Sequence, residues 1–161
     1  MFSVKRPDKP SAFKQGLDDL MPGDTILVSR LAGSFTLPKD VSKKVAFLAG
    51  GIGVTPFRSM AKYMLDSGQK RDAVLVYSAN STAELSFQKI FEQARSAGLS
   101  PRYITDGHLD ETKIKALIPD FAERRFYISG PYGFVKAIEN DLLKLGVDPA
   151  QTVTDYFPGY G

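Results

Sequence analysis

The sequence has no cysteine and only one histidine, His108, among its 161 residues. The absence of cysteine excludes disulfides, thiolate metal sites and thiol chemistry. A single histidine supplies too few ligands for a histidine-rich metal site. We therefore predict that the protein holds no metal ion.

Long apolar runs are also missing. No run reaches the ~20 residues that a membrane-spanning helix needs, and the opening residues MFSVKR lack the apolar core of a secretory signal. We expect no membrane span and a cytoplasmic location.

An excess of one charge sign is missing as well. The chain has 21 basic and 18 acidic residues, and its basic residues form no run longer than two. The pairs Lys43–Lys44, Lys70–Arg71 and Arg124–Arg125 are interpreted as solvated surface. We expect no nucleic-acid partner, because such partners need a concentrated basic surface.

Short apolar runs recur about every 25 residues from residue 45 onward, and helical patterns fill the gaps. The runs lack in/out alternation, which favours strands that are covered on both faces, as in parallel sheets. The pattern predicts an α/β fold with a five-stranded parallel doubly wound sheet in the order 3-2-1-4-5. The five strands are expected at 45–49, 73–77, 102–104, 125–128 and 152–153.

Capping signals accompany the helices. Thr55 is placed to cap the first helix, and Gly68 to stop it. Ser81 and Glu84 form a capping box before the second helix. Asp110 opens a short third helix, and a last apolar stripe runs from 135 to 145.

Residues 1–41 have a different pattern. Strands are expected at 1–5 and 25–29, a short helix at 11–20 and an extended connector at 33–38. Two strands and one helix cannot bury a core alone. We interpret this segment as part of a β domain whose other strands are missing, followed by a nucleotide-binding domain at 42–161.

A glycine-rich turn, AGGIGVTP at 49–56, follows the first strand of the sheet. Glycines let the backbone approach a ligand closely, and the N-terminus of the following helix suits a pyrophosphate. The turn is not the G-x-G-x-x-G fingerprint. The alternative is a tight turn that binds nothing.

Two more segments follow strand ends. ISGPYGF at 128–134 is expected to face the glycine turn across one crevice, with Ser129 at its floor. SANST at 78–82 lies where an adenosine ribose usually binds. It offers neither an acidic residue nor a basic cluster, so the preference between NAD and NADP stays open. Ser129 and Ser81 also have ordinary roles available, at a strand end and a helix cap.

The chain ends in TDYFPGYG at 154–161, whose three aromatic residues are expected either to cover a flat redox ring or to pack on their own domain.

Taken in order, these motifs resemble the ferredoxin–NADP reductase superfamily. The glycine turn is similar to the family's pyrophosphate loop, 129–131 to its C-G-P loop and 155–157 to its acidic-x-aromatic element. Residues 11–38 are similar to the end of its flavin domain, so residues 1–41 would be a partial β-barrel remnant of an FAD-binding domain.

The resemblance implies a flavin-dependent NAD(P)H oxidoreductase, in which hydride passes from NAD(P)H to FAD and electrons then reach an iron–sulfur protein or a flavodoxin. It implies catalytic roles for Thr55, Ser129 and Asp155. The implied NAD(P)H-binding residues are Gly50, Gly51, Gly53, Val54, Thr55, Pro56, Ser78, Asn80, Ser81, Gly130, Pro131 and Tyr132. The implied FAD-binding residues are Ser11, Phe157 and Tyr160.

Two departures from the family qualify this hypothesis. The flavin-gripping R-x-Y-S/T motif does not occur, so the chain is a fragment, a shortened reading frame or a protein that has lost much of its flavin domain. We therefore expect incomplete FAD binding and a colourless chain. Ser129 replaces the family's cysteine. The alternative function is an NAD(P)-binding module without flavin or catalysis. A signalling receiver is disfavoured, because the strand ends carry no acidic cluster.

Overall fold

The computed structural model describes residues 9–27 and 33–157 and divides into two compact units, Met1–Ser34 and Phe35–Gly161. In the first unit, helix α1 (Ala12–Asp18) begins after Ser11, whose hydroxyl accepts a hydrogen bond from the Lys14 N–H. A turn follows, in which the Asp24 N–H donates to the Met21 carbonyl oxygen at 3.0 Å. The short helix confirms the sequence prediction.

The strands predicted in this first unit have a different outcome. Residues 1–5 lie outside the described residues, as do 28 and 29. Residues 25–27 form no strand, and the Leu27 side chain is fully exposed. That part of the prediction is wrong, because a strand is stable only when a neighbouring strand satisfies its backbone groups and covers its apolar face.

The second unit is built on a parallel sheet in the order β3-β2-β1-β4-β5, which confirms the predicted fold and strand order. Every residue of the central strand β1 is buried. The strands are β1 (Val45–Gly50), β2 (Ala73–Ser78), β3 (Leu99–Ile104), β4 (Arg125–Pro131) and β5 (Thr152–Phe157). The helices are α2 (Thr55–Ser67), α3 (Gln88–Gln93), α4 (Glu111–Leu117) and α5 (Tyr132–Lys144).

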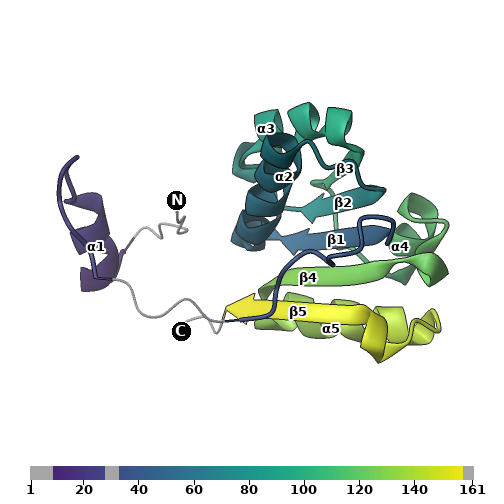
Figure 1. Cartoon of the computed structure of the whole chain (residues 1–161). Coiled ribbons are helices and arrows are strands. Elements are labelled where there is room, and N and C mark those ends of the chain that lie inside the picture. The colour runs from purple at the N-terminus through teal and green to yellow at the C-terminus, as the bar shows by residue number, and fades with distance from the viewer. Residues whose placement is uncertain (1–8, 28–32, 158–161) are drawn as a thin grey trace. The chain divides into compact units, whose positions relative to one another are not determined.

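Helices cover both faces of the sheet (Figure 1). Helices α2 and α3 pack on one face with Phe47 and Tyr127, and helices α4 and α5 pack on the other with Leu48 and Ile128. Successive side chains of a strand point to opposite faces, so the side chains of β1 and of β4 contribute to two apolar cores, one on each face. This is why their sequences are continuously apolar. Among the described residues, no helix is long and apolar enough to cross a bilayer.

Two predicted helix starts need correction. Residues Gly51–Val54 form a 3₁₀ turn that runs directly into α2, so Thr55 is the first helical residue and caps nothing with its side chain. Helix α3 begins only at Gln88, and Ser81 makes no side-chain cap. The Tyr77 hydroxyl explains the second case: it donates to the Glu84 carbonyl oxygen at 3.1 Å and accepts from the Ser86 N–H at 3.2 Å. These bonds hold the chain against β2 where the capping box was expected.

The other predicted helix ends are confirmed. Gly68, in the left-handed region at φ 66°, ends α2. The Asp110 side chain accepts a hydrogen bond from the Lys113 N–H and caps α4. Gly146, at φ 79°, follows the last residues of α5.

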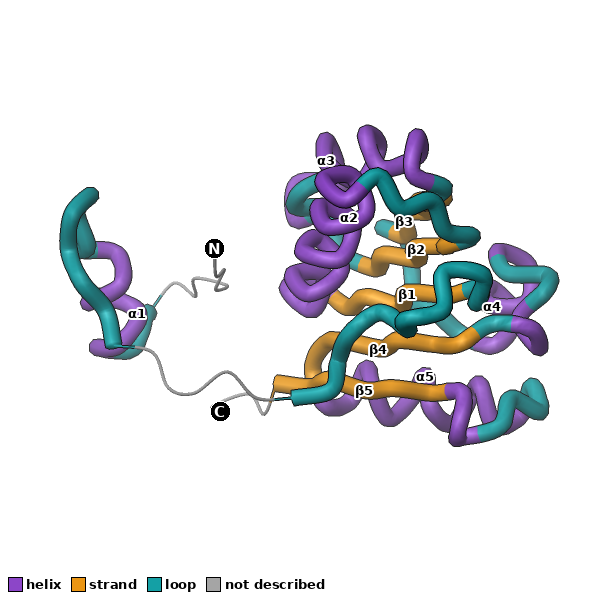
Figure 2. Tube along the Cα trace, in the orientation of Figure 1, coloured by secondary structure: helices purple, strands orange, loops and turns teal. Residues whose placement is uncertain are grey.

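Residues 35–41, called the connector from here on, begin within the extended segment predicted at 33–38. They belong to the second unit and have neither helix nor strand (Figure 2). The Phe35 ring lies edge-on to Tyr127 of β4 at 5.4 Å between centroids. The Tyr127 hydroxyl donates to the Thr36 carbonyl oxygen at 2.8 Å. These contacts fix the connector over the α2 face of the sheet. The assignment of residues 1–41 to a flavin domain stays a prediction.

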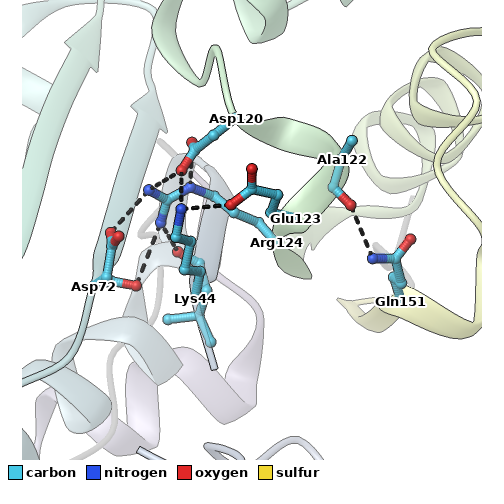
Figure 3. A network of polar contacts seen from close by, with 8 residues as sticks. Lys44, Asp72, Asp120, Ala122, Glu123, Arg124 and Gln151 are labelled. Carbon is cyan, nitrogen blue, oxygen red and sulfur yellow. Dashed lines mark hydrogen bonds and ion pairs between the residues drawn. The ribbon is translucent and has the colours of Figure 1, made fainter. Parts of the chain in front are cut away.

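Two of the basic pairs are not solvated surface. Arg71 and Arg124 are both 5% exposed, whereas Lys70 and Arg125 are exposed. Figure 3 shows Arg124 at the centre of an ionic network. Its guanidinium pairs with Asp120 at 2.7 Å and Asp72 at 2.8 Å, and it donates to the Val45 carbonyl oxygen at 3.1 Å. The network therefore joins the amino ends of β1, β2 and β4.

Asp120 contributes acid-sensitive stability through this network. The hydrogen bond from Arg124, and then one from Lys44, hold the pKa of the Asp120 carboxyl below its ordinary value of 3.8. A depressed folded-state pKa stabilises the fold above the unfolded value, and this stability is lost as pH falls through the folded value. Asp120→Asn is expected to lower the free energy of unfolding at pH 7 by about 1–3 kcal/mol.

Urea unfolding followed by circular dichroism from pH 7 to pH 3 measures this effect. The difference between wild type and Asp120→Asn should shrink below about pH 4. Asp66→Asn, which breaks an exposed pair with Lys62 on α2, is the control and should change stability by no more than about 0.5 kcal/mol. A pH-independent difference would contradict the assignment.

Candidate functional site

The two glycine-rich segments predicted to form a nucleotide site meet at the carboxyl edge of the sheet. Strands β1 and β4 are neighbours, with Ala49 in register with Ser129. A Cβ atom built on Gly130 would lie 3.2 Å from the Gly50 Cα atom. The structure therefore brings the turn at 49–56 and the loop at 128–134 together at the switch point of the sheet, where α/β folds bind ligands.

The glycines of this edge serve different purposes. A Cβ on Gly53 would lie 2.2 Å from the Ser129 carbonyl oxygen, so only glycine lets the 3₁₀ turn pack on the β4 backbone. Cβ atoms on Gly50 or Gly130 would lie 2.8 Å from the Phe134 ring. Of Gly50, Gly51, Gly53 and Gly130, three are thus required by internal packing, whereas Gly133 in the first turn of α5 is not.

Gly51 is the exception. No atom lies within 4 Å of the position where its Cβ would stand, and its φ of 53° is in the left-handed region. Its backbone faces open space at the start of the 3₁₀ turn that leads into α2. Backbone N–H groups at a helix N-terminus attract anions. Gly51 therefore leaves the backbone of this turn open to a ligand.

A row of side chains crosses the sheet beside this turn. Ala49, Ser129 and Asp155 are in register on β1, β4 and β5, on the face that α2 covers. Ser129 is fully buried, and its hydroxyl has no hydrogen-bond partner among the described residues. Burial raises the pKa of the Asp155 carboxyl above its ordinary value. The row places a hydroxyl and a carboxyl of raised pKa next to the glycine turn.

The loop after β2 holds a residue that sequence reasoning missed. Ser78 ends β2 in register with Gly50, while Asn80 and Ser81 are exposed beyond it. The Asn80 side-chain amide donates to the Glu84 carboxylate at 3.3 Å. Glu84 thus places a carboxylate beside the 78–82 segment, which has no acidic residue of its own. The sequence analysis assigned Glu84 to a helix-capping box, whereas the structure places it in the 3₁₀ turn Thr82–Glu84.

The remaining predicted residues lie apart from this row. Tyr132, the first residue of α5, is exposed and packs edge-on to Tyr156 at 5.3 Å between centroids. Phe157 ends β5 in register with Pro131 and is 43% exposed. Ser11 belongs to the first unit, and the structure does not relate it to the others. Tyr160 lies outside the described residues.

Residues 47–140 match the family of oxidoreductase NAD-binding domains. The chain belongs to this family. It is 29% identical over 145 residues to the glycine betaine monooxygenase reductase subunit of Pseudomonas aeruginosa, covering 81% of this chain and 40% of that protein. It is 25% identical over 176 residues to the stachydrine N-demethylase reductase subunit of Rhizobium meliloti, covering 99% of this chain and 50% of that protein. The chain thus spans half or less of the length of these relatives.

Solved structures share the fold. The FAD/NAD-binding domain of nitric oxide dioxygenase from Vibrio cholerae superposes with a TM-score of 0.68 at 24% identity, covering 78% of this chain and 55% of that one. A mutant ferredoxin–NADP+ reductase from Plasmodium falciparum superposes with a TM-score of 0.74 at 16% identity, covering 92% and 67%. The fold is that of the ferredoxin–NADP reductases, as the sequence motifs predict.

The role of Gly51 is tested by Gly51→Asn, because asparagine tolerates a positive φ but fills the open space in front of the backbone. We expect the affinity for NAD and NADP, measured by calorimetry, to fall at least about tenfold. Gly68→Asn is the matched control, since Gly68 also has a positive φ and open space but lies at the other end of α2. Equal affinities in the two variants would place the pyrophosphate elsewhere.

Proposed function

We propose that this chain is the nucleotide-binding portion of a flavin-dependent NAD(P)H oxidoreductase that passes electrons to an acceptor protein. The observation that carries the proposal is the juxtaposition of the open Gly51 turn with Ser129 and Asp155 on one face of the sheet. The reductase relatives support it. The acceptor would be an iron–sulfur protein or a flavodoxin.

The nucleotide would lie along the carboxyl edge of the sheet. Gly50, Gly51 and Gly53 shape the pyrophosphate turn, with Val54, Thr55 and Pro56 at the entry to α2. Ser78, Asn80 and Ser81 would hold the adenosine ribose, joined by Glu84. Ser129, Gly130, Pro131 and Tyr132 would line the nicotinamide end. The unpartnered Ser129 hydroxyl fits this ligand, because a carboxamide both donates and accepts hydrogen bonds.

The flavin would lie against the end of β5. Bound FAD supplies hydride acceptance and one-electron transfer, and the protein supplies binding, orientation and electrostatics. Phe157 offers a half-exposed ring for this purpose, and Ser11 and Tyr160 are proposed contacts from the two ends of the chain. Thr55 and Ser129 would orient the nicotinamide. Asp155, whose pKa is raised by burial, would set the local charge beside the reacting rings.

Domain organisation follows from the same proposal. Residues 1–41 would be the end of a flavin-binding β domain, and residues 42–161 the NAD(P)-binding domain. The segment Phe35–Val41 would then belong to the flavin domain by origin, although it packs on the second unit.

The variant Ser129→Ala tests whether the Ser129 hydroxyl contacts the nucleotide or only supports the fold. Removing a buried hydroxyl without a partner should leave the nucleotide-free chain as stable as wild type or up to about 1 kcal/mol more stable. The affinity for NAD(P) should fall several-fold, whereas ADP-ribose, which lacks the nicotinamide, should bind as tightly as before. Calorimetry and thermal unfolding measure both quantities. An equal loss for ADP-ribose would show that Ser129 acts only through the fold.

Catalysis is tested by fusing the chain behind the FAD-binding part of the Vibrio cholerae nitric oxide dioxygenase domain. We expect a yellow fusion that oxidises NAD(P)H with ferricyanide as acceptor, and Gly51→Asn should abolish this activity while Gly68→Asn retains it. If the flavin-loaded fusion binds NAD(P) in a way that depends on Gly51 but oxidises no NAD(P)H, the chain is an NAD(P)-binding module without catalysis.

A further inference from the structure

A groove of about 690 Å³ lies between the connector and helix α2, entirely within the second unit. Its volume falls in the range of roughly 300–1,000 Å³ that is typical of small-molecule sites. The walls are mainly apolar, with Leu37 and Pro38 from the connector and Met60 and Tyr63 from α2. Small-molecule sites combine such walls with a few placed polar groups.

The groove is separate from the proposed nucleotide site. Pro56 is the one residue that both share. From there the groove follows α2 to its other end, where Gln69 and Arg71 line it. Arg71 lies just before β2, at the amino edge of the sheet, whereas the nucleotide site lies at the carboxyl edge.

Arg71 is a buried cation that forms no direct ion pair with a carboxylate among the described residues, although the nearby Asp40 carboxylate attracts it. Its guanidinium donates to the carbonyl oxygens of Pro38 at 2.9 Å and Asp40 at 3.2 Å and to the Gln69 side-chain oxygen at 3.1 Å, all of them neutral acceptors. Its Nε atom is buried with no partner. The Asp40 carboxylate accepts hydrogen bonds from Ser42 instead. Burial of a charge is unfavourable unless it is paired.

Arg124 shows what a paired arginine looks like in the same chain. It is equally buried, but Asp72 and Asp120 neutralise it. Around the groove no residue is acidic, and the second cation, Lys39, is exposed and forms no ion pair within the described part of the chain. The groove therefore combines an apolar wall with two cations, neither of which is directly paired with a carboxylate in the described part of the chain.

We propose that this groove binds a small organic anion, an apolar ring or chain that carries one carboxylate. The apolar body would lie against Met60 and Tyr63, and the carboxylate would lie toward Arg71 and Lys39. The apolar wall favours an organic anion over a free phosphate, because inorganic phosphate has no apolar surface to bury against it. This second site does not depend on the proposed oxidoreductase activity.

The probe for the test is 1-naphthoate, followed by amide chemical shifts in a nuclear magnetic resonance titration of the whole chain. We expect saturable shifts at the connector and the groove face of α2, and affinity at least about tenfold weaker for the neutral 1-naphthalenemethanol and for inorganic phosphate. The alcohol binding as tightly as the naphthoate would overturn the anionic specificity. Shifts centred on Gly51 instead would overturn the location.

Variants test the same site. Ser59→Trp places an indole into the groove from α2 and should abolish naphthoate binding, whereas Lys62→Trp, on an exposed position that does not line the groove, should retain it. Lys39→Gln, an exposed change that leaves the fold intact, should weaken naphthoate several-fold and leave the alcohol unchanged. Naphthoate should bind undiminished to Gly51→Asn, which separates this proposal from the nucleotide site. Wild-type naphthoate affinity in Ser59→Trp would refute the proposal.

Discussion

The contact between Gly53 and the backbone of β4 sets the geometry of the whole carboxyl edge. The turn after β1 leaves the sheet on the α2 side and must pass directly over the Ser129 carbonyl group, where a Cβ atom would lie 2.2 Å from oxygen. On the opposite side, the Phe134 ring fills the space beneath Gly50 and Gly130. These two packing contacts fix the turn rigidly at the switch point. Gly51 adopts the positive φ that this turn needs, but its Cβ position has no packing contact inside the protein.

The sheet and its strand order were predictable because they depend on burial. A strand covered on both faces must be apolar throughout, and right-handed crossovers then leave few possible orders. The helix starts were less predictable. The Ser81 cap failed because the Tyr77 hydroxyl, from a different element, holds the chain at Glu84 and Ser86. Local capping signals carry no information about such distant competitors.

The location of the candidate site was predictable from the sequence, but the separate role of each glycine in it was not. The sequence offers Gly50, Gly51, Gly53 and Gly130 as equivalent glycines, and only distances in space show which of them face protein. The same holds for arginine. Arg71 and Arg124 each stand in a basic pair with an exposed neighbour, so the sequence favoured solvated surface for both. Their burial follows from the turns before β2 and β4, where the chain folds back over the sheet.

Polar groups without partners gather on one face of the sheet. Among the described residues, the buried side-chain atoms that lack a hydrogen bond are the Arg71 Nε and the Ser129 Oγ. Asp155, half-buried and in register with Ser129, has no hydrogen bond or ion pair in the same part of the chain. Native proteins satisfy nearly all buried polar groups, and exceptions require an explanation. All three lie on the side of the sheet that α2 and the connector cover. On the face of α4 and α5, every fully buried side-chain nitrogen or oxygen among the described residues has a hydrogen-bond partner. The unpartnered groups therefore coincide with the two proposed binding sites, Ser129 and Asp155 with the nicotinamide end and Arg71 with the groove.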